Sequence, residues 1–305
     1  MSSTTASMNK SLMQLSTGKR ILSPSDDVLA SNQILGLNDQ LAMLETYEKN
    51  IGSAQNSLSM AETVVTDMVN VLNRVRDLVL ASGSATVQPY PTDGEEPVQP
   101  LPPEDGEGDR TAHLQEIEML METLMDLANT KSSSGEYIFG GTQGDRPPVG
   151  EGDDGIFVGG SDGSREIQIS DSQTVILGIV AGDLFSLDDG ENIFSAMEEF
   201  LAIASDPNTT QDEFDQIMAD TLDAIDETLG NMNQSLTKIG ASMNTLDMAA
   251  NSNAEMQMYN DMLVSGLEDL DYASAITEYS MLLTQMQAGQ KAYAMVGSTS
   301  LFDYV

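Results

Sequence analysis

Residues 37–58 read LNDQLAMLETYEKNIGSAQNSL. Alternating steps of four and three residues from Leu37 lead to Leu58. The residues reached by these steps are apolar, except for Glu48 and Gln55. This alternation places the set along one face of a helix and is typical of helices that pair lengthwise. Residues 31–80 contain no proline, so we expect one helix of 50 residues, roughly 75 Å long.

The same stepping continues to Val79 after one short step of three, from Leu58 to Ala61. A missing residue of this kind is a stammer, and it predicts local overwinding of the paired helices. The predicted inward set is Leu37, Leu41, Leu44, Glu48, Ile51, Gln55, Leu58, Ala61, Val65, Met68, Leu72, Val75 and Val79.

A second long helical pattern fills the C-terminal third of the chain. A shorter helix is expected at His113–Asn129, and the N-terminal segment carries one further helical stripe, Met8, Leu12 and Leu15. The C-terminal stripes consist of Leu229, Met232, Leu236, Ile239, Met243, Leu246 and Ala250, and then of Ile276, Tyr279, Leu283, Met286, Gln290 and Tyr293.

The middle of the chain changes character. Residues 135–180 are rich in glycine and aspartate, with short β-like runs separated by turn residues. This composition predicts a small antiparallel β domain inserted into a helical chain. The expected strands are 137–139, 156–158, 166–169 and 174–180.

The predicted fold is therefore mainly α with a small inserted β domain, built on long paired helices from the N- and C-terminal segments. Residues 89–109 hold six of the ten prolines and seven acidic residues, which predicts an acidic loop without regular structure. The expected domains are a terminal helical assembly region of residues 1–18 and 270–305, a helical rod domain of 19–134 and 206–269, and a β-rich outer domain of 135–205.

Composition excludes several classes of protein. The 305 residues include 12 Lys and Arg against 49 Asp and Glu, a net charge of -37, which argues against nucleic acid and anionic lipid as partners. The acidity suits a saline medium as well as it suits a specific role. No window is long and apolar enough to be a membrane span, and the N-terminus has no apolar core of a secretory signal peptide.

The sequence predicts no catalytic, cofactor-binding or metal-binding residues, and hence no enzyme. Residues 159–163 match G-x-S-x-G, but a hydrolase of that type needs a later histidine, and the single histidine is His113. There are no cysteines, so disulfides, thiolate metal sites and cysteine nucleophiles are excluded.

Three segments resemble a known family. Residues 15–27, LSTGKRILSPSDD, are similar to the N-terminal signature of the flagellin superfamily. Residues 129–141, NTKSSSGEYIFGG, resemble the helix-to-β junction of those members that join the flagellar hook to the filament, and residues 300–305, SLFDYV, resemble the ending of the same members. Only 14 residues precede Leu15, fewer than is usual in the family, which predicts that part of the first helix is missing.

The resemblance implies an extracellular flagellar protein that a type III apparatus exports unfolded, with an export chaperone and without a cleaved signal. It implies a structural, non-enzymatic subunit that assembles with itself into a ring between the neighbouring hook-associated protein and flagellin. Its N- and C-terminal helices would pair as the inner layer. The predicted assembly residues are Met8, Leu12, Leu15, Ile276, Tyr279, Leu283, Met286, Tyr293, Leu301, Phe302 and Tyr304.

Two alternatives remain at this point. A divergent flagellin would share the same signatures, although the ending of residues 300–305 favours the junction members. An acidic coiled-coil binding protein would share the heptads alone.

Overall fold

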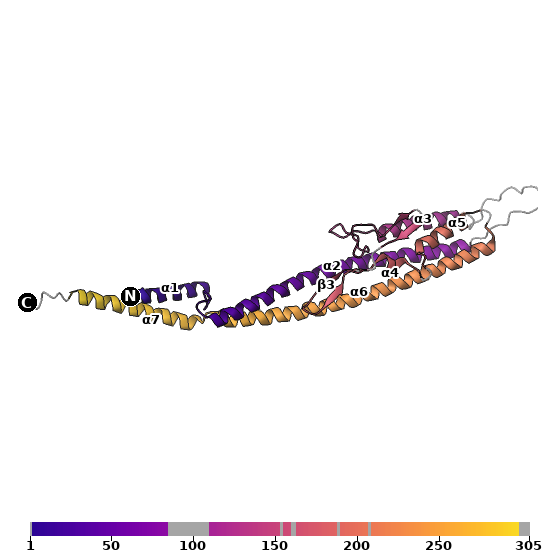
Figure 1. Cartoon of the computed structure of the whole chain (residues 1–305). Coiled ribbons are helices and arrows are strands. Elements are labelled where there is room, and N and C mark those ends of the chain that lie inside the picture. The colour runs from indigo at the N-terminus through magenta and orange to yellow at the C-terminus, as the bar shows by residue number, and fades with distance from the viewer. Residues whose placement is uncertain are drawn as a thin grey trace, which may run out of the picture. The chain divides into compact units, whose positions relative to one another are not determined.

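The computed structural model describes residues 2–84, 110–152, 155–159, 163–187, 190–206 and 209–298. The predicted acidic loop of residues 89–109 lies outside these. The model confirms a mainly helical chain with a small inserted β region (Figure 1). The helices are α1 (Ser2–Thr17), α2 (Val28–Ser84), α3 (Arg110–Ala128), α4 (Ala181–Phe185), α5 (Ile193–Ser205), α6 (Gln211–Glu268) and α7 (Tyr272–Ser298).

The chain forms two compact units. The terminal unit contains residues 1–48 and 251–305, and the central unit contains residues 49–250. The predicted border of the terminal assembly region, at residues 18 and 270, falls near the ends of α1 and α6. That these residues bound a separate domain stays a prediction.

In the central unit, α2 buries one continuous face from Ile51 to Val79. The buried set steps by three and four without interruption, because it passes through Ala54 and not through Gln55. The predicted stammer between Leu58 and Ala61 is therefore wrong: a regular heptad register runs through both residues. We call this set the α2 seam, and each member is at most 2 % exposed: Ile51, Ala54, Leu58, Ala61, Val65, Met68, Leu72, Val75 and Val79.

In the central unit, α6 lies beside α2 in the opposite direction (Figure 1). Gln55 Nε2 donates a 2.9 Å hydrogen bond to Asp247 Oδ1, and Arg76 Nε lies 3.1 Å from Asp226 Oδ1. Gln55 thus flanks the seam, and its side-chain amide has a hydrogen-bond acceptor on α6. This explains why a polar residue is tolerated there.

The buried face of α6 is partly polar. Thr221 and Thr228 are at most 1 % exposed, and each hydroxyl donates to the carbonyl four residues earlier, at 2.7 and 2.8 Å. Because the hydroxyl is satisfied within its own helix, a small side chain can occupy the seam without leaving an unpaired polar group. The seam of α6 therefore falls on Thr221, Ile225, Thr228, Met232, Ser235, Ile239 and Leu246.

The inserted region contains two separate two-stranded antiparallel sheets. Strands β1 (Val149–Gly152) and β2 (Gly155–Val158) form one, and β3 (Glu166–Gln168) and β4 (Thr174–Ile176) form the other. The prediction of a β insert is confirmed, but the expected strand at residues 137–139 is wrong. Tyr137 makes only an isolated bridge to Lys131.

Helices α4 and α5, which the sequence pattern does not predict, also lie within this region. Their buried aromatic side chains belong to the core of the central unit: the ring centroids of Phe185 and Phe194 lie 5.1 Å apart, and those of Phe200 and of Phe214 in α6 lie 6.0 Å apart. Asn192 caps α5 by accepting a hydrogen bond from the Ser195 backbone N–H.

Candidate assembly interface

In the terminal unit, the turn after α1 is bonded to the turn between α6 and α7. Leu270 N donates to Gly18 O at 2.9 Å, and Arg20 N donates to Glu268 O at 2.6 Å. These two hydrogen bonds flank an antiparallel bridge between Lys19 and Asp269. We call this arrangement the joint. It brings together residues about 250 positions apart in the sequence. It lies at one end of the helix pair in which α1 packs against α7.

Side chains of the signature segment strengthen the joint. Arg20 Nη2 donates a 2.7 Å hydrogen bond to Leu267 O, one of the last carbonyls of α6. Lys19 Nζ lies 2.7 Å from Glu268 Oε1. Both cations therefore sit at the C-terminal end of α6, where unpaired carbonyls and the helix dipole favour positive charge.

The two aspartates of the signature hold the turn between α1 and α2. Asp26 Oδ2 accepts hydrogen bonds from the backbone N–H groups of Leu22 and Ser23, and its Oδ1 lies 2.6 Å from Lys10 Nζ. The Lys10 bond, with those from the backbone, lowers the pKa of Asp26 below the usual value of an aspartate. Asp27 is the N-cap of α2: its Oδ1 accepts from Ala30 N at 3.1 Å, and this bond lowers its pKa as well.

Asp271 plays the same part for α7. Its Oδ2 accepts a 2.7 Å hydrogen bond from the Ser274 hydroxyl, and its Oδ1 accepts from the backbone N–H groups of Ala273 and Ser274. The Ser274 hydroxyl is the main cause that lowers the pKa of Asp271. This cap is not among the predicted features, although an Asp immediately before a helix is a recognisable start signal.

The lowered pKa of Asp26 predicts how acid affects the turn between α1 and α2. A carboxyl group whose pKa is lower in the folded than in the unfolded chain contributes stability above the unfolded pKa and loses it as pH falls through the folded pKa. The Asp26→Asn variant should therefore melt below the parent at pH 7, and the gap should close as pH falls from about 4 towards 2. Circular dichroism melts of both proteins measure it. A gap that persists at pH 2 would contradict the assigned charge effect.

Gly18 ends α1 in a conformation that other residues disfavour. Its φ is +73°, and a Cβ there would lie 2.9 Å from the hydroxyl oxygen of Tyr272. We expect Gly18→Ala to open the joint, because the left-handed conformation costs an alanine about 1–2 kcal/mol and Tyr272 must also move. Trypsin reports this directly, since Lys19 and Arg20 are cleavage sites inside the joint: the variant should be cut there faster.

A glycine-to-alanine change elsewhere in the terminal unit is the control. Gly36 lies within α2, and a Cβ there meets nothing within 4 Å, so Gly36→Ala should leave tryptic cleavage at the joint unchanged. Equal cleavage rates in the parent and in Gly18→Ala would show that the joint does not depend on this backbone conformation.

The structure separates the predicted assembly residues into three groups. Met8 and Leu15 on α1, with Tyr279, Leu283 and Met286 on α7, are half-buried. Leu12, Ile276 and Tyr293 are exposed, at 52 %, 54 % and 75 %. The expected stripes are thus not single faces. Leu301, Phe302 and Tyr304 lie outside the described residues.

Two small residues are buried on the terminal helices α1 and α7. Ser11 and Ala275 are buried in the terminal unit, at 4 % and 7 %, although neither belongs to a predicted stripe. A register counted on large apolar residues misses them, because close helix packing favours small side chains at the contact.

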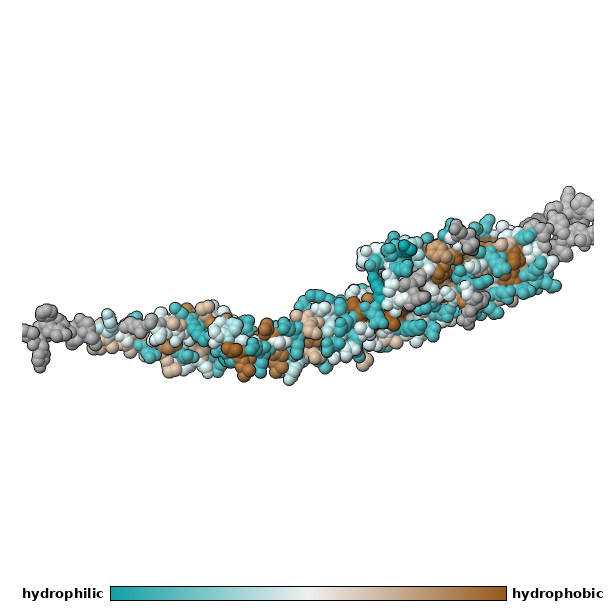
Figure 2. All heavy atoms as spheres, viewed as in Figure 1, coloured by the Kyte–Doolittle hydropathy of each residue, from teal (hydrophilic) through white to brown (hydrophobic). Residues whose placement is uncertain are grey.

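Exposed apolar side chains on α1 and α7 extend beyond the predicted set. Met13, Met281 and Met295 are 58–66 % exposed. Residues of α7 also line a groove of about 590 Å³, formed by Ile276, Thr277, Ser280, Met281, Thr284, Gln285 and Ala288. Figure 2 shows apolar residues at several places on an otherwise hydrophilic surface. Large contiguous apolar patches on a protein surface are a general feature of sites of protein association.

Metal-binding clusters and membrane-spanning helices are absent from the part of the chain that the structure describes. Groups of three or more Asp, Glu, His or Cys with the geometry of a metal site are absent from it. None of the helices there has the length and hydropathy needed to cross a membrane.

Comparisons with known proteins agree with the signature segments. The bacterial flagellin N-terminal helical region matches residues 1–93, and the bacterial flagellin C-terminal helical region matches residues 222–305. Together the two matched regions cover more than half of the chain, and both segments of the joint fall within them.

Similar proteins align over nearly the whole chain. Flagellar hook-associated protein 3 of Escherichia coli is 25% identical over 95% of this chain and 90% of its own length, and that of Salmonella typhimurium is 22% identical over the same shares. Flagellin of Bacillus subtilis is 21% identical over 96% of this chain and 90% of its own.

Solved structures share the fold. A flagellar hook-associated protein from Vibrio parahaemolyticus superposes with a TM-score of 0.70 at 22% identity, covering 80% of this chain and 100% of that one. The flagellar junction protein FlgL from Legionella pneumophila gives 0.59 at 17% identity, over 78% and 100%. The chain belongs to the flagellin superfamily, at both its N- and C-terminal helical regions, and is a structural subunit of the bacterial flagellum.

Proposed function

We propose that this chain joins the flagellar hook to the filament, as a ring of copies held together through the terminal helices. The observation that carries the proposal is the exposed apolar surface of the α1–α7 pair, represented by Leu12, Met13, Ile276 and Met281. The names of the relatives that align over nearly the whole chain, hook-associated protein 3, support the place in the flagellum.

Burial of these side chains between copies supplies the driving force. Each Leu, Ile or Met that moves from water to a packed interface contributes about 1.5–3 kcal/mol, so several per copy are enough for a stable contact. The joint contributes by fixing how α1 and α7 lie relative to one another within the terminal unit, so that the apolar surface is presented before assembly.

The partners follow from this place in the flagellum. The ring contacts further copies of the chain, the neighbouring hook-associated protein on one side and flagellin on the other. The chain reaches the outside of the cell by type III export with an export chaperone, without a cleaved signal, and it catalyses no reaction. Its lack of cysteine suits a protein that passes from a reducing to an oxidising compartment.

A deletion strain tests the proposal. Without the chain, cells should carry hooks that lack filaments and should release flagellin into the medium, and a plasmid copy should restore filaments. Immunogold labelling of a tagged, functional copy should mark one narrow band at the base of each filament. Label along the whole filament would identify a divergent flagellin instead, the function of the Bacillus subtilis relative.

A further inference from the structure

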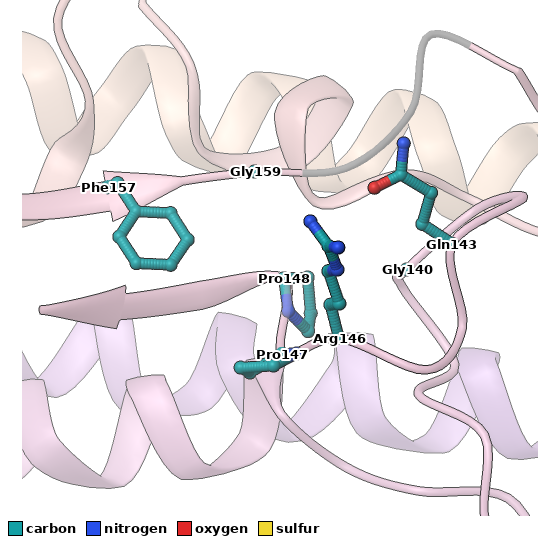
Figure 3. A pocket seen from close by; sticks show the side chains of 7 residues that line it. All are labelled: Gly140, Gln143, Arg146, Pro147, Pro148, Phe157 and Gly159. Atoms are coloured by element: carbon teal, nitrogen blue, oxygen red, sulfur yellow. The ribbon is translucent and has the colours of Figure 1, made fainter. Parts of the chain in front are cut away.

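A small cleft on the inserted region presents a free arginine beside an exposed aromatic ring. The cleft has a volume of about 290 Å³ and is lined by Gln143, Arg146, Pro147, Phe157 and neighbouring residues (Figure 3). Figure 3 shows the Arg146 side chain rising between Pro148 and Gln143, with the Phe157 ring to one side. Arginine and aromatic side chains are the residues that most often dominate protein interfaces.

The ring of Phe157 is held on the outer face of the β1–β2 hairpin. Ile156 beside it points inward and is 6 % exposed, whereas Phe157 is 44 % exposed. Phe157 pairs with Gly150 across the hairpin, and a Cβ at Gly150 would lie 3.0 Å from the ring atoms Cε1 and Cζ. Because Gly150 has no side chain, the ring can pack against its backbone. The position of the ring is therefore set in the free chain, before a partner binds.

Arg146 differs from most of the basic residues in its lack of side-chain partners among the residues that the structure describes. Its guanidinium group makes no hydrogen bond or ion pair with any residue that the structure describes. Most other cations are engaged: ion pairs hold Lys10, Lys19, Arg20, Arg74, Arg76 and Arg165, and Arg110 and Lys131 lie over aromatic rings. In a chain of net charge -37, an unpaired arginine is a point that attracts another acidic copy.

A surface of complementary character lies elsewhere in the same central unit. A groove of about 340 Å³ between α5 and α6 is lined by the carboxylates of Glu199, Asp220 and Asp223, together with apolar Leu187 and Ile217. The groove combines negative charge with apolar contact surface, the properties that an arginine and a phenylalanine together require.

We propose that Arg146 and Phe157 of one copy dock into the α5–α6 groove of the next copy around the ring. The contact is heterologous, because it joins two different surfaces of identical chains, and repetition of such a contact closes a ring when the rotation allows it. The inference rests on the proposed function for its ring, and it adds which surfaces of the central unit meet there.

Cysteine cross-linking tests the contact, because the chain has no cysteine of its own. Cells should produce two single-cysteine variants together, Gln143→Cys at the cleft and Ala196→Cys in the groove, and isolated flagella should be treated with a short thiol-specific cross-linker. A cross-linked dimer should form only when both variants are present. The control pair of Gln143→Cys with Lys238→Cys, outside both surfaces, should give none.

Charge reversal gives a second readout on the same flagella. Arg146→Glu in the Gln143→Cys chain should lower the yield of dimer by about tenfold, because it places like charges together, whereas Arg146→Lys should retain most of it. Lys238→Glu changes the net charge by the same amount and should leave the yield unchanged. Circular dichroism melts confirm that each variant is folded, which is expected since Gln143 and Arg146 are exposed.

The outcomes separate the two proposals. This contact is overturned if flagella that contain both variants give no dimer. It is also overturned if the control pair, or the pair that carries Arg146→Glu, gives as much dimer as the test pair. Either result leaves the junction role intact. Absence of the chain from flagella that otherwise form normally overturns the junction role itself.

Discussion

Replacing Ile276 and Tyr293 together by aspartate should leave the folded monomer nearly unchanged and abolish the attachment of filaments. Both side chains are more than half exposed, and substitutions at such positions usually change stability by less than about 0.5 kcal/mol. In an assembled ring the same positions would bury two carboxylates without partners, which costs several kcal/mol per charge. A thermal melt of the purified monomer and a swimming assay of the complemented deletion strain measure the two effects.

The half-buried residues of the same helix provide a contrast. Leu283→Asp with Met286→Asp should lower the melting temperature of the monomer, because both side chains are half-buried on α7, the helix that packs against α1. The sequence pattern alone would treat all four positions as equivalent. Swimming at the parent's speed by the Ile276→Asp, Tyr293→Asp variant would contradict the role of the exposed surface.

A second pair of substitutions distinguishes the observed register of α2 from the register that the sequence predicts. Ala54→Gln should destabilise the chain by about 2–5 kcal/mol, because the larger side chain overpacks the α2 seam and buries an amide without a partner. Gln55→Ala should cost less than about 1.5 kcal/mol, since it removes one hydrogen bond, to Asp247, at the edge of the seam.

Urea unfolding of both variants measures these differences as shifts of the midpoint at constant slope. The predicted register with its stammer requires the opposite ranking, because it places Gln55 inward and Ala54 outward. Equal effects of the two substitutions would mean that neither position belongs to a defined seam.

The candidate site could be predicted in part from the sequence. The signature of residues 15–27 was recognisable as a segment, but its contacts with Leu267, Glu268 and Asp269 were not, because nothing local links positions about 250 residues apart. The cap formed by Asp27 is a local helix-start signal that can be recognised from the sequence alone. The bond from Lys10 to Asp26 depends on how α1 folds back and needs the structure.

The sequence by itself determined the long helices, the inserted β region and the acidic surface. Heptad spacing over many turns and the glycine-rich turns are local signals, repeated often enough to outweigh single exceptions. Only the tertiary structure decided the register of the seam, the helices α4 and α5, and which apolar residues of α1 and α7 remain exposed. The physical reason is that a helix presents several faces of similar hydrophobicity, and the choice among them depends on the partner. Ala54 is buried in the seam, while the neighbouring Gln55 donates a hydrogen bond to Asp247 of α6 at its edge.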